Sequence, residues 1–224
     1  MKIALIKENK IPIDRRVPLT PEQCQSIKKQ YPTIEIVAQT SDIRCFTDED
    51  YRKAGIQIVE EVKDCDVLLG VKEVPIKNLL EGKTYFFFSH TSKEQPYNRA
   101  LLQNVIEKGN TLVDYESLTN EKGVRVIAFG RYAGLVGAYN GILTYGKRTN
   151  LFDLKPAHQC FDMKEMWGEF DKIKLPPLKI VVTGGGRVAK GAMETLDGMK
   201  IRKVNPTDFL SQEFDEAVYT QVQT

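Results

Sequence analysis

Hydrophobic and polar positions alternate along the N-terminal half of the chain in a strand–helix–strand rhythm. Short apolar runs rich in β-branched and aromatic residues alternate with polar segments of helical spacing. The apolar runs are residues 2–6, 34–39, 56–59, 66–72, 84–90 and 111–115, and the helical segments are residues 20–31, 48–55 and 93–109. This alternation predicts an α/β domain with a mainly parallel sheet.

A longer helical segment is predicted from about Arg125 to Tyr145. It carries four glycines spaced three or four residues apart, Gly130, Gly134, Gly137 and Gly141. This spacing places the glycines on one helical face, where each costs about 1 kcal/mol relative to alanine. We therefore expect a closely packed partner on that face. A core helix and a helix that joins two domains near a ligand both fit the pattern.

A glycine cluster between a strand and a helix marks the segment Leu178–Leu196. Gly184, Gly186 and Ala189 fit the pattern G-x-G-x-x-G/A, in which the glycines permit a tight turn and the approach of a pyrophosphate. The N-terminus of the following helix supplies free N–H groups to that anion. The pattern predicts a dinucleotide site that includes Arg187, while a glycine-rich turn that binds nothing is the structural alternative.

The second strand of this region, residues 200–205, ends in Asn205, where an acidic residue that binds the ribose is expected. Arg202 and Lys203 are close by in the sequence. The neutral Asn205 is assigned to the cofactor site, and the choice between NAD and NADP stays open.

The pattern loosens between Lys147 and Pro177, which indicates a domain boundary. We predict a substrate-side domain over residues 1–146, a connecting segment over 147–177 and the start of a dinucleotide-binding domain over 178–224. That last domain is incomplete on this interpretation, because a mononucleotide-binding half requires three strands and two helices.

Composition and charge favour a small-molecule site. The 32 basic and 30 acidic residues nearly cancel, so neither nucleic acid nor an anionic membrane is indicated as a partner. No apolar stretch approaches the roughly 20 residues that span a bilayer, and the first residues do not resemble a signal peptide, so we expect a cytoplasmic protein. The four cysteines are scattered, which predicts neither a metal site nor a disulfide framework.

Two apolar runs end in groups that can transfer protons. Lys72 and Glu73 follow residues 66–71, and His90 follows residues 84–89. Both strand ends therefore carry candidate proton-transfer groups. The structural alternatives are a solvated strand end and a histidine satisfied within the core.

Five collinear stretches resemble the lysine-forming saccharopine dehydrogenase group of the alanine dehydrogenase and transhydrogenase superfamily. They are "DRRVPLTP", "LLGVKEVP", "FFFSHTSKEQ", "TLVDYESL" and "VRVIAFGRYAGLVGA", and the similarity resumes at "VVTGGGRVAKGA". The resemblance implies two Rossmann-like domains with mainly parallel sheets. It also implies oxidation of a secondary amino acid such as saccharopine by NAD, with NADP not excluded, releasing an amino acid and a 2-oxo acid.

The resemblance also implies roles for the candidate residues. Lys72 would be the general base toward the secondary amine and its imine, and His90 the acid–base partner for the attacking water and the leaving amine. Glu73 and Glu116 would belong to the same substrate site and tune the charge of that pair.

Carboxylate groups of the substrate need cationic partners. The resemblance places the substrate-binding arginine at Arg16, with Arg15 beside it, and a guanidinium is suited to bidentate capture of a carboxylate. Lys93 is the candidate for a second carboxylate anchor, and Arg131 would lie near the site if the glycine-rich helix borders it.

Members of this family are longer than the chain, which is therefore expected to be a fragment or a true short product. Two other functions stay open at this stage. One is alanine dehydrogenase-like deamination of a small amino acid, and the other is a non-catalytic binding or regulatory module that keeps the substrate-side fold. An oligomer is compatible with all three.

Overall fold

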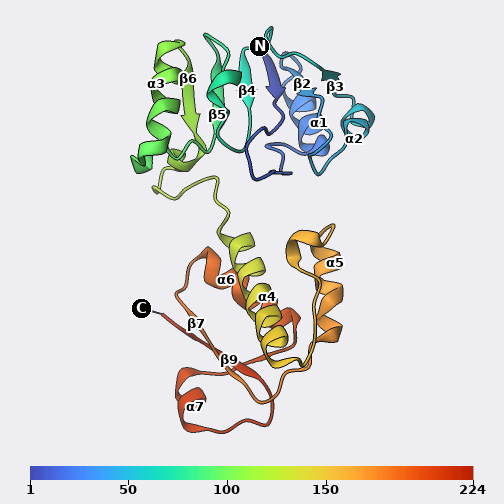
Figure 1. The fold of residues 1–224 in the computed structure, drawn as a ribbon, viewed down its shortest axis with the longest axis vertical. Helices are drawn as coiled ribbons and strands as arrows, with labels where there is room; N and C mark the ends of the chain where they lie inside the picture. The colour runs from blue at the N-terminus through green and yellow to red at the C-terminus, as the bar shows by residue number, and fades with distance from the viewer. Residues whose placement is uncertain (224) are drawn as a thin grey trace. The chain divides into compact units, whose positions relative to one another are not determined.

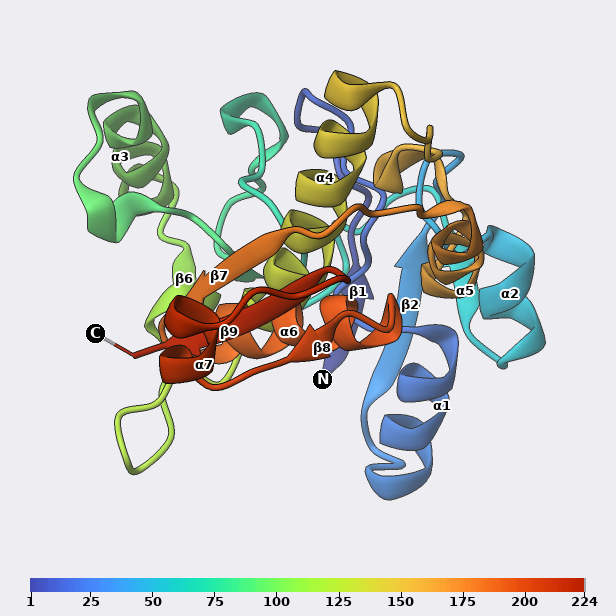
Figure 2. The same cartoon turned by 90° about the horizontal axis from the view of Figure 1, so that it is seen from below.

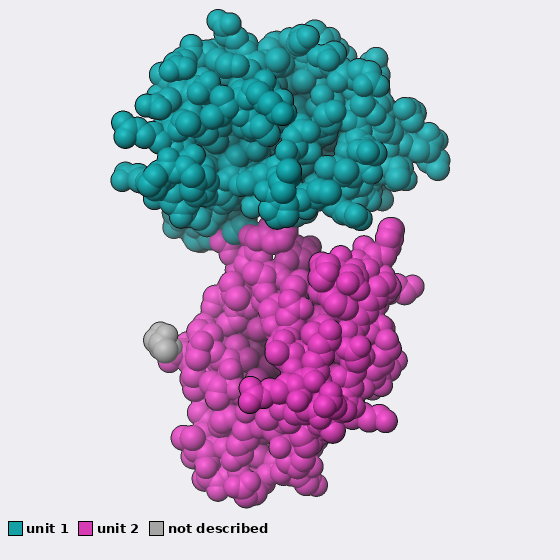
Figure 3. Space-filling model, viewed as in Figure 1, with its two compact units in different colours: residues 1–128 teal, residues 129–224 magenta. Residues whose placement is uncertain are grey.

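The computed structural model describes residues 1–223 and forms two compact units (Figures 1 and 3). The first unit is Met1–Ala128 and the second is Phe129–Thr224. The division precedes helix α4 (Gly130–Thr149), whereas the sequence pattern placed residues 1–146 in the first domain. The difference arises because α4 packs along a helix of the second unit.

The first unit contains a parallel sheet of six strands (Figure 1). The strands are β1 (Lys2–Leu5), β2 (Glu35–Gln39), β3 (Gln57–Val59), β4 (Val67–Leu69), β5 (Thr84–Phe87) and β6 (Thr111–Asp114). Their order is β3-β2-β1-β4-β5-β6, and every neighbouring pair is parallel. The predicted α/β class with a mainly parallel sheet is confirmed.

Three α-helices cover this sheet. Thr20 and Gln23 form a capping box at α1 (Pro21–Gln30), and Thr47 and Asp50 form one at α2 (Asp48–Lys53). Helix α3 (Arg99–Glu107) begins later than the pattern predicted, because the chain is extended before Pro96 and 3₁₀ turns precede the helix. Short 3₁₀ turns of this unit are η1 (Ile76–Asn78), η2 (Thr91–Lys93), η3 (Pro96–Asn98) and η4 (Tyr115–Ser117).

Hydrophobic clusters lie on both faces of the six-stranded sheet. Ala4 belongs to a cluster that includes Leu101 of α3, whereas Leu5 belongs to a cluster that includes Cys24 of α1 and Tyr51 of α2. Successive strand residues point to opposite faces, so α3 lies on one face and α1 and α2 lie on the other. The loops at the carboxyl edge of the sheet are therefore held by two cores.

The second unit contains a smaller parallel sheet. Its elements after α4 are α5 (Met163–Gly168), β7 (Lys179–Thr183), α6 (Arg187–Gly198), β8 (Arg202–Lys203), α7 (Pro206–Ser211) and β9 (Val218–Val222), with 3₁₀ turns η5 (Ala157–Gln159) and η6 (Glu169–Lys172). The strand order is β7-β9-β8, so β9 separates the first two strands (Figure 2). In a doubly wound mononucleotide-binding half the second strand is the direct neighbour of the first.

Helices α4 and α6 pack at glycine contacts. A Cβ atom on Gly134 would lie 2.0 Å from the Val188 carbonyl oxygen, and one on Gly191 would lie 2.0 Å from the Arg131 carbonyl oxygen. The expectation of a closely packed partner is thus confirmed for Gly134. It is wrong for the Gly137 and Gly141 positions, where an added Cβ would meet nothing within 4 Å.

Candidate functional site

The candidate site lies at the carboxyl edge of the six-stranded sheet. The chain proceeds outward from β1 through β2 to β3 on one side, and then from β4 through β5 to β6 on the other. The topological switch point is therefore between β1 and β4, which is the location where open α/β sheets bind ligands. The residues that follow β1, β4, β5 and β6 supply the polar groups.

Glu8, which follows β1, connects the two loops at the switch point. Its Oε1 accepts a hydrogen bond from the Val71 N–H at 2.7 Å, and its Oε2 accepts one from the Lys72 N–H at 3.0 Å. The side chain is buried, and this burial raises the pKa of the Glu8 carboxyl. Glu8 thereby fixes the backbone that carries Lys72 and Glu73, a role that our sequence analysis missed.

His90 lies beside two carboxylates. Its Nδ1 is 3.2 Å from the Oε2 of Glu116, and its Nε2 is 3.9 Å from the Oε1 of Glu73. The ring also stacks on Phe88 with centroids 6.4 Å apart. The structure therefore brings together three predicted site residues, which come from the loops after β4, β5 and β6.

Cations surround the same carboxylates. Lys10 Nζ lies 2.5 Å from Glu73 Oε2, and Lys93 Nζ lies 3.2 Å from Glu116 Oε1. Arg125 Nη1 is 3.6 Å from the same Glu116 oxygen. Burial alone would raise the pKa of Glu116, but contacts with His90 and Lys93 outweigh burial and hold that pKa below its ordinary value. Our sequence analysis did not identify Lys10 or Arg125.

Arg16 uses its guanidinium fork on a neighbouring carboxylate. Its Nε donates to Asp14 Oδ1 at 2.9 Å, and its Nη2 donates to Asp14 Oδ2 at 2.5 Å. This pairing raises the pKa of Arg16 despite the opposing effect of burial. For Asp14, burial acts to raise the pKa of the carboxyl, but the contacts with Arg16 hold that pKa below its ordinary value. The predicted carboxylate binder is thus oriented by an internal acid.

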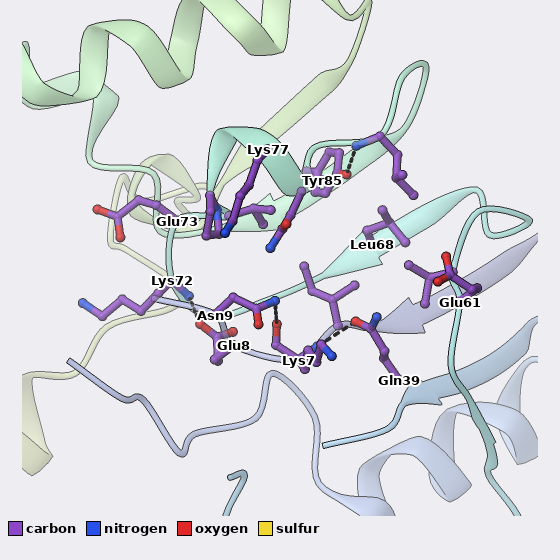
Figure 4. A pocket seen from close by; sticks show the side chains of 16 residues that line it. Lys7, Glu8, Asn9, Gln39, Glu61, Leu68, Lys72, Glu73, Lys77 and Tyr85 are labelled. Atoms are coloured by element: carbon purple, nitrogen blue, oxygen red, sulfur yellow. Dashed lines mark hydrogen bonds between the residues drawn. The ribbon is translucent and has the colours of Figure 1, made fainter. Parts of the chain in front are cut away.

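The loop that carries Lys72 and Glu73 also borders a cavity of 460 Å³ (Figure 4). The Lys72 and Glu73 side chains extend to the same side, away from Leu68 and Tyr85. Within residues 1–223 the Lys72 ammonium makes no salt bridge or hydrogen bond, although its charge contributes to the lowered pKa of Asp14. His90 is not among the residues that line this cavity.

The glycine turn of the second unit has the geometry that the motif predicts. Gly184 has a φ of +85°, a conformation that favours glycine, and Gly186 is the N-cap of α6 without a side-chain cap. A Cβ atom on Gly186 would meet nothing within 4 Å, which leaves room for a ligand beside the backbone. Arg187 begins α6, and Ala189, two residues later, is buried. These residues fit a bound pyrophosphate.

Asn205 follows strand β8. It is the N-cap of α7, where its Oδ1 accepts from the Asp208 N–H at 2.8 Å. Strand β9 lies between β8 and β7, and the Gln221 amide on β9 donates to the Gly184 carbonyl at 2.8 Å. The local pattern did not predict this strand order. The predicted contact of Asn205 with the cofactor stays a prediction.

Arg131 belongs to the second unit and pairs with Glu194. The two side chains form a fork, with Nε to Oε2 at 2.8 Å and Nη2 to Oε1 at 2.5 Å. Both side chains are on the packed pair α4 and α6. The predicted substrate contact of Arg131 stays a prediction.

The described residues contain neither a metal-binding cluster nor a membrane-spanning helix. Among residues 1–223 there is no group of three or more His, Cys, Asp or Glu side chains placed to hold a metal ion. No helix in that same range is long and apolar enough to cross a membrane.

Comparisons with known proteins define the family. Residues 4–136 match the model of the alanine dehydrogenase/PNT N-terminal domain, and the chain belongs to this family. The mitochondrial alpha-aminoadipic semialdehyde synthase of Rattus norvegicus is 32% identical over 222 residues, covering 91% of the chain and 24% of the relative. The saccharopine dehydrogenase [NAD(+), L-lysine-forming] of Emericella nidulans is 34% identical over 211 residues, covering 86% and 55%.

Solved structures show the same fold. An L-alanine dehydrogenase superposes with a TM-score of 0.64 at 18% identity, covering 99% of this chain and 61% of its own. A transhydrogenase from Sinorhizobium meliloti gives a TM-score of 0.64 at 17% identity, covering 98% and 64%. The resemblance inferred from the motifs is confirmed, and the chain spans less than two thirds of the length of each of these relatives.

Proposed function

We propose that the chain supplies the substrate side of a nicotinamide-dependent oxidoreductase acting on the CH–NH group of a secondary amino acid such as saccharopine. The products would be an amino acid and a 2-oxo acid. The observation that carries the proposal is the placement of His90 between Glu73 and Glu116, with Lys72 directly before Glu73 in the chain, in a protein related to saccharopine dehydrogenases.

Lys72 is proposed as the general base toward the substrate amine. Removal of a proton from the secondary amine accompanies oxidation of its C–H bond and leaves an imine. No carboxylate contacts the Lys72 nitrogen directly within residues 1–223, so no ion pair occupies this amine. Glu8 holds the backbone of this residue by its N–H, so the side chain starts from a fixed position.

His90 is proposed as the acid–base group for hydrolysis of the imine. Imidazole titrates in the range where it can both accept and donate a proton near neutral pH. Glu116 contacts Nδ1, which leaves Nε2 to exchange protons with the attacking water and the leaving amine. Glu73, 3.9 Å from Nε2, stabilises positive charge on the ring when it forms.

Arg16 and Lys93 are proposed to bind the carboxylates of the substrate. Arg16 carries a planar guanidinium, and Asp14 fixes its orientation through Nε and Nη2. Lys93 Nζ is half exposed while it contacts Glu116, so its other donors can reach a ligand. A secondary amine that carries several carboxylates, such as saccharopine, has the negative charges that such a cationic site recognises.

A nicotinamide cofactor would accept the hydride, and the turn between β7 and α6 fits its pyrophosphate. Gly184, Gly186 and Arg187 would hold that group at the N-terminus of α6. The name of the Emericella nidulans relative specifies NAD(+), and we propose NAD for this chain with NADP as the alternative. A cytoplasmic location stays a prediction, since a relative in Rattus norvegicus is described as mitochondrial.

A substrate screen tests the proposed reaction. The chain, and the longest reading frame that contains it, are assayed with NAD(H) and NADP(H) against saccharopine, alanine, and lysine with 2-oxoglutarate. Turnover with saccharopine, or in reverse with lysine and 2-oxoglutarate, is expected from the longer product. Turnover with alanine alone would replace the proposal by an alanine dehydrogenase-like reaction, and ligand binding without turnover would indicate a binding module.

Replacing Gly186 with alanine is expected to weaken nucleotide binding about tenfold, a loss of about 1.4 kcal/mol. The added methyl group would stand where the backbone approaches the pyrophosphate. The methyl group itself would meet no protein atom within 4 Å, so the protein fold should tolerate it. Calorimetric titration with NAD⁺ measures the change. Gly141→Ala also adds a methyl group in open space and is the matched control. Equal affinity in both variants would remove the turn from the cofactor site.

A further inference from the structure

Asp114, the last residue of β6, connects the two loops that carry His90 and Glu116. Its Oδ2 accepts a hydrogen bond from the Ser89 hydroxyl at 2.5 Å. Its Oδ1 accepts one from the Glu116 N–H at 2.8 Å. One carboxylate thus fixes the residue that precedes the imidazole and the backbone of the glutamate that contacts it.

Ser89 extends this connection to the other side of His90. Its side chain is fully buried, and its oxygen accepts a hydrogen bond from the Thr91 N–H at 3.1 Å while lying 2.7 Å from the Thr91 hydroxyl. His90 itself has a φ of 55°, in the left-handed region that a residue with a side chain rarely occupies. The bonds on both sides of His90 stabilise this backbone conformation.

We propose that Asp114 and Ser89 are positioning residues that hold the His90 imidazole against Glu116. The inference rests on the proposed function, in which His90 exchanges protons at Nε2. A fixed contact at Nδ1 leaves Nε2 available for that exchange. Neither residue was singled out by the sequence, and neither has a contact that would make it a proton donor to the substrate. Their contacts join the ends of the adjacent strands β5 and β6.

The electrostatic coupling between His90 and Glu116 measures this positioning directly. The groups that face His90 are Glu116 at Nδ1 and Glu73 at Nε2, and the cations on those carboxylates are Lys93, Arg125 and Lys10. Removing the Glu116 charge with Glu116→Gln takes a negative neighbour from the imidazole. It is therefore expected to weaken proton binding by the imidazole, and NMR titration measures this effect.

The test is a double-mutant cycle read by NMR titration of the 224-residue chain, without substrate. His158 is the other histidine, lies in the second unit and serves as internal reference. In Asp114→Ala and in Ser89→Ala the effect of Glu116→Gln on the His90 pKa is expected to fall to less than half. Asp114→Asn keeps an acceptor for the Glu116 N–H and a partner for Ser89, and is expected to retain most of the coupling.

Asp48 provides the matched control. Asp48 is the first residue of α2, its Oδ2 accepts from the Thr40 hydroxyl at 2.6 Å and its Oδ1 accepts from the Ser41 N–H at 3.2 Å, so it also connects two segments through a hydroxyl and an N–H, and it pairs with Arg44 in addition. Asp48→Ala is expected to lower stability and leave the coupling unchanged. Undiminished coupling in Ser89→Ala would overturn the proposal, and this milder variant decides the question if Asp114→Ala does not fold.

This outcome is separable from the outcome for the proposed function. The coupling is measured on the free chain, so it stays informative when no substrate is turned over. If the Asp114→Ala and Ser89→Ala variants reduce the coupling but no product turns over saccharopine, the positioning role is kept and the proposed reaction is refuted. If these variants leave the coupling undiminished and saccharopine is turned over, the positioning role is refuted and the proposed reaction is kept.

Discussion

Replacing Lys72 with methionine is expected to lower turnover of the longer protein about 10²- to 10⁴-fold, the effect of removing a general base. Methionine keeps the length of the side chain and removes the nitrogen that would accept the proton. In the unchanged protein turnover is expected to fall at low pH, where a general base is protonated, and this acid limb should disappear or move in the variant. The measurement is the pH profile of kcat for amine oxidation.

His90→Gln should give a loss of a similar kind. The loss in the double variant should be much smaller than the product of the two single losses, since both residues serve one sequence of proton transfers. Lys77→Met is a matched control, because Lys77 lines the cavity near Lys72 but is exposed and has no assigned role. Wild-type turnover in either single variant would show that Lys72 and His90 are ordinary strand-end residues.

Replacing Gly134 with alanine is expected to destabilise the second unit by about 3 kcal/mol or more, because the new methyl group would overlap packed backbone. The nearest atom is the Val188 carbonyl oxygen, at 2.0 Å, and α6 would have to move to make room. Urea unfolding followed by the fluorescence of Trp167, the single tryptophan and part of this unit, measures the change. Gly191→Ala should act in the same way, since its methyl group would meet the Arg131 carbonyl oxygen.

Gly137→Ala on the same helix should change stability in the opposite direction. The position is exposed and open, so alanine should raise the free energy of unfolding by about 0.5–1 kcal/mol through its higher helix propensity. If Gly134→Ala were as stable as Gly137→Ala, the close contact between α4 and α6 would be refuted.

Local patterns were sufficient to predict the first sheet. Its strands are short apolar runs separated by helices with strong caps, such as Thr20 before α1, and this rhythm admits mainly a parallel sheet. Lys72 and His90 were identified for the same reason, because a polar group directly after a buried strand stands out in the sequence.

Contacts between distant segments were not predictable in the same way. Glu8 and Lys10 bind groups 63 or 64 residues further along the chain, and no spacing rule relates such positions. The glycine stripe predicted a packed face but not its length, because crossing helices diverge away from their contact, which leaves Gly137 uncovered. The position of β9 between β7 and β8 was not predictable either, because strand order depends on contacts between distant segments.

The central position of β1 has a consequence for synthesis on the ribosome. β1 emerges well before its partner β4, which begins only at Val67, and the Glu8 bonds to Val71 and Lys72 need that segment too. At about 5–20 residues per second, one edge of β1 waits on the order of several seconds for its partner. During that interval the nascent chain exposes an unpaired apolar strand, which is the kind of surface that chaperones bind.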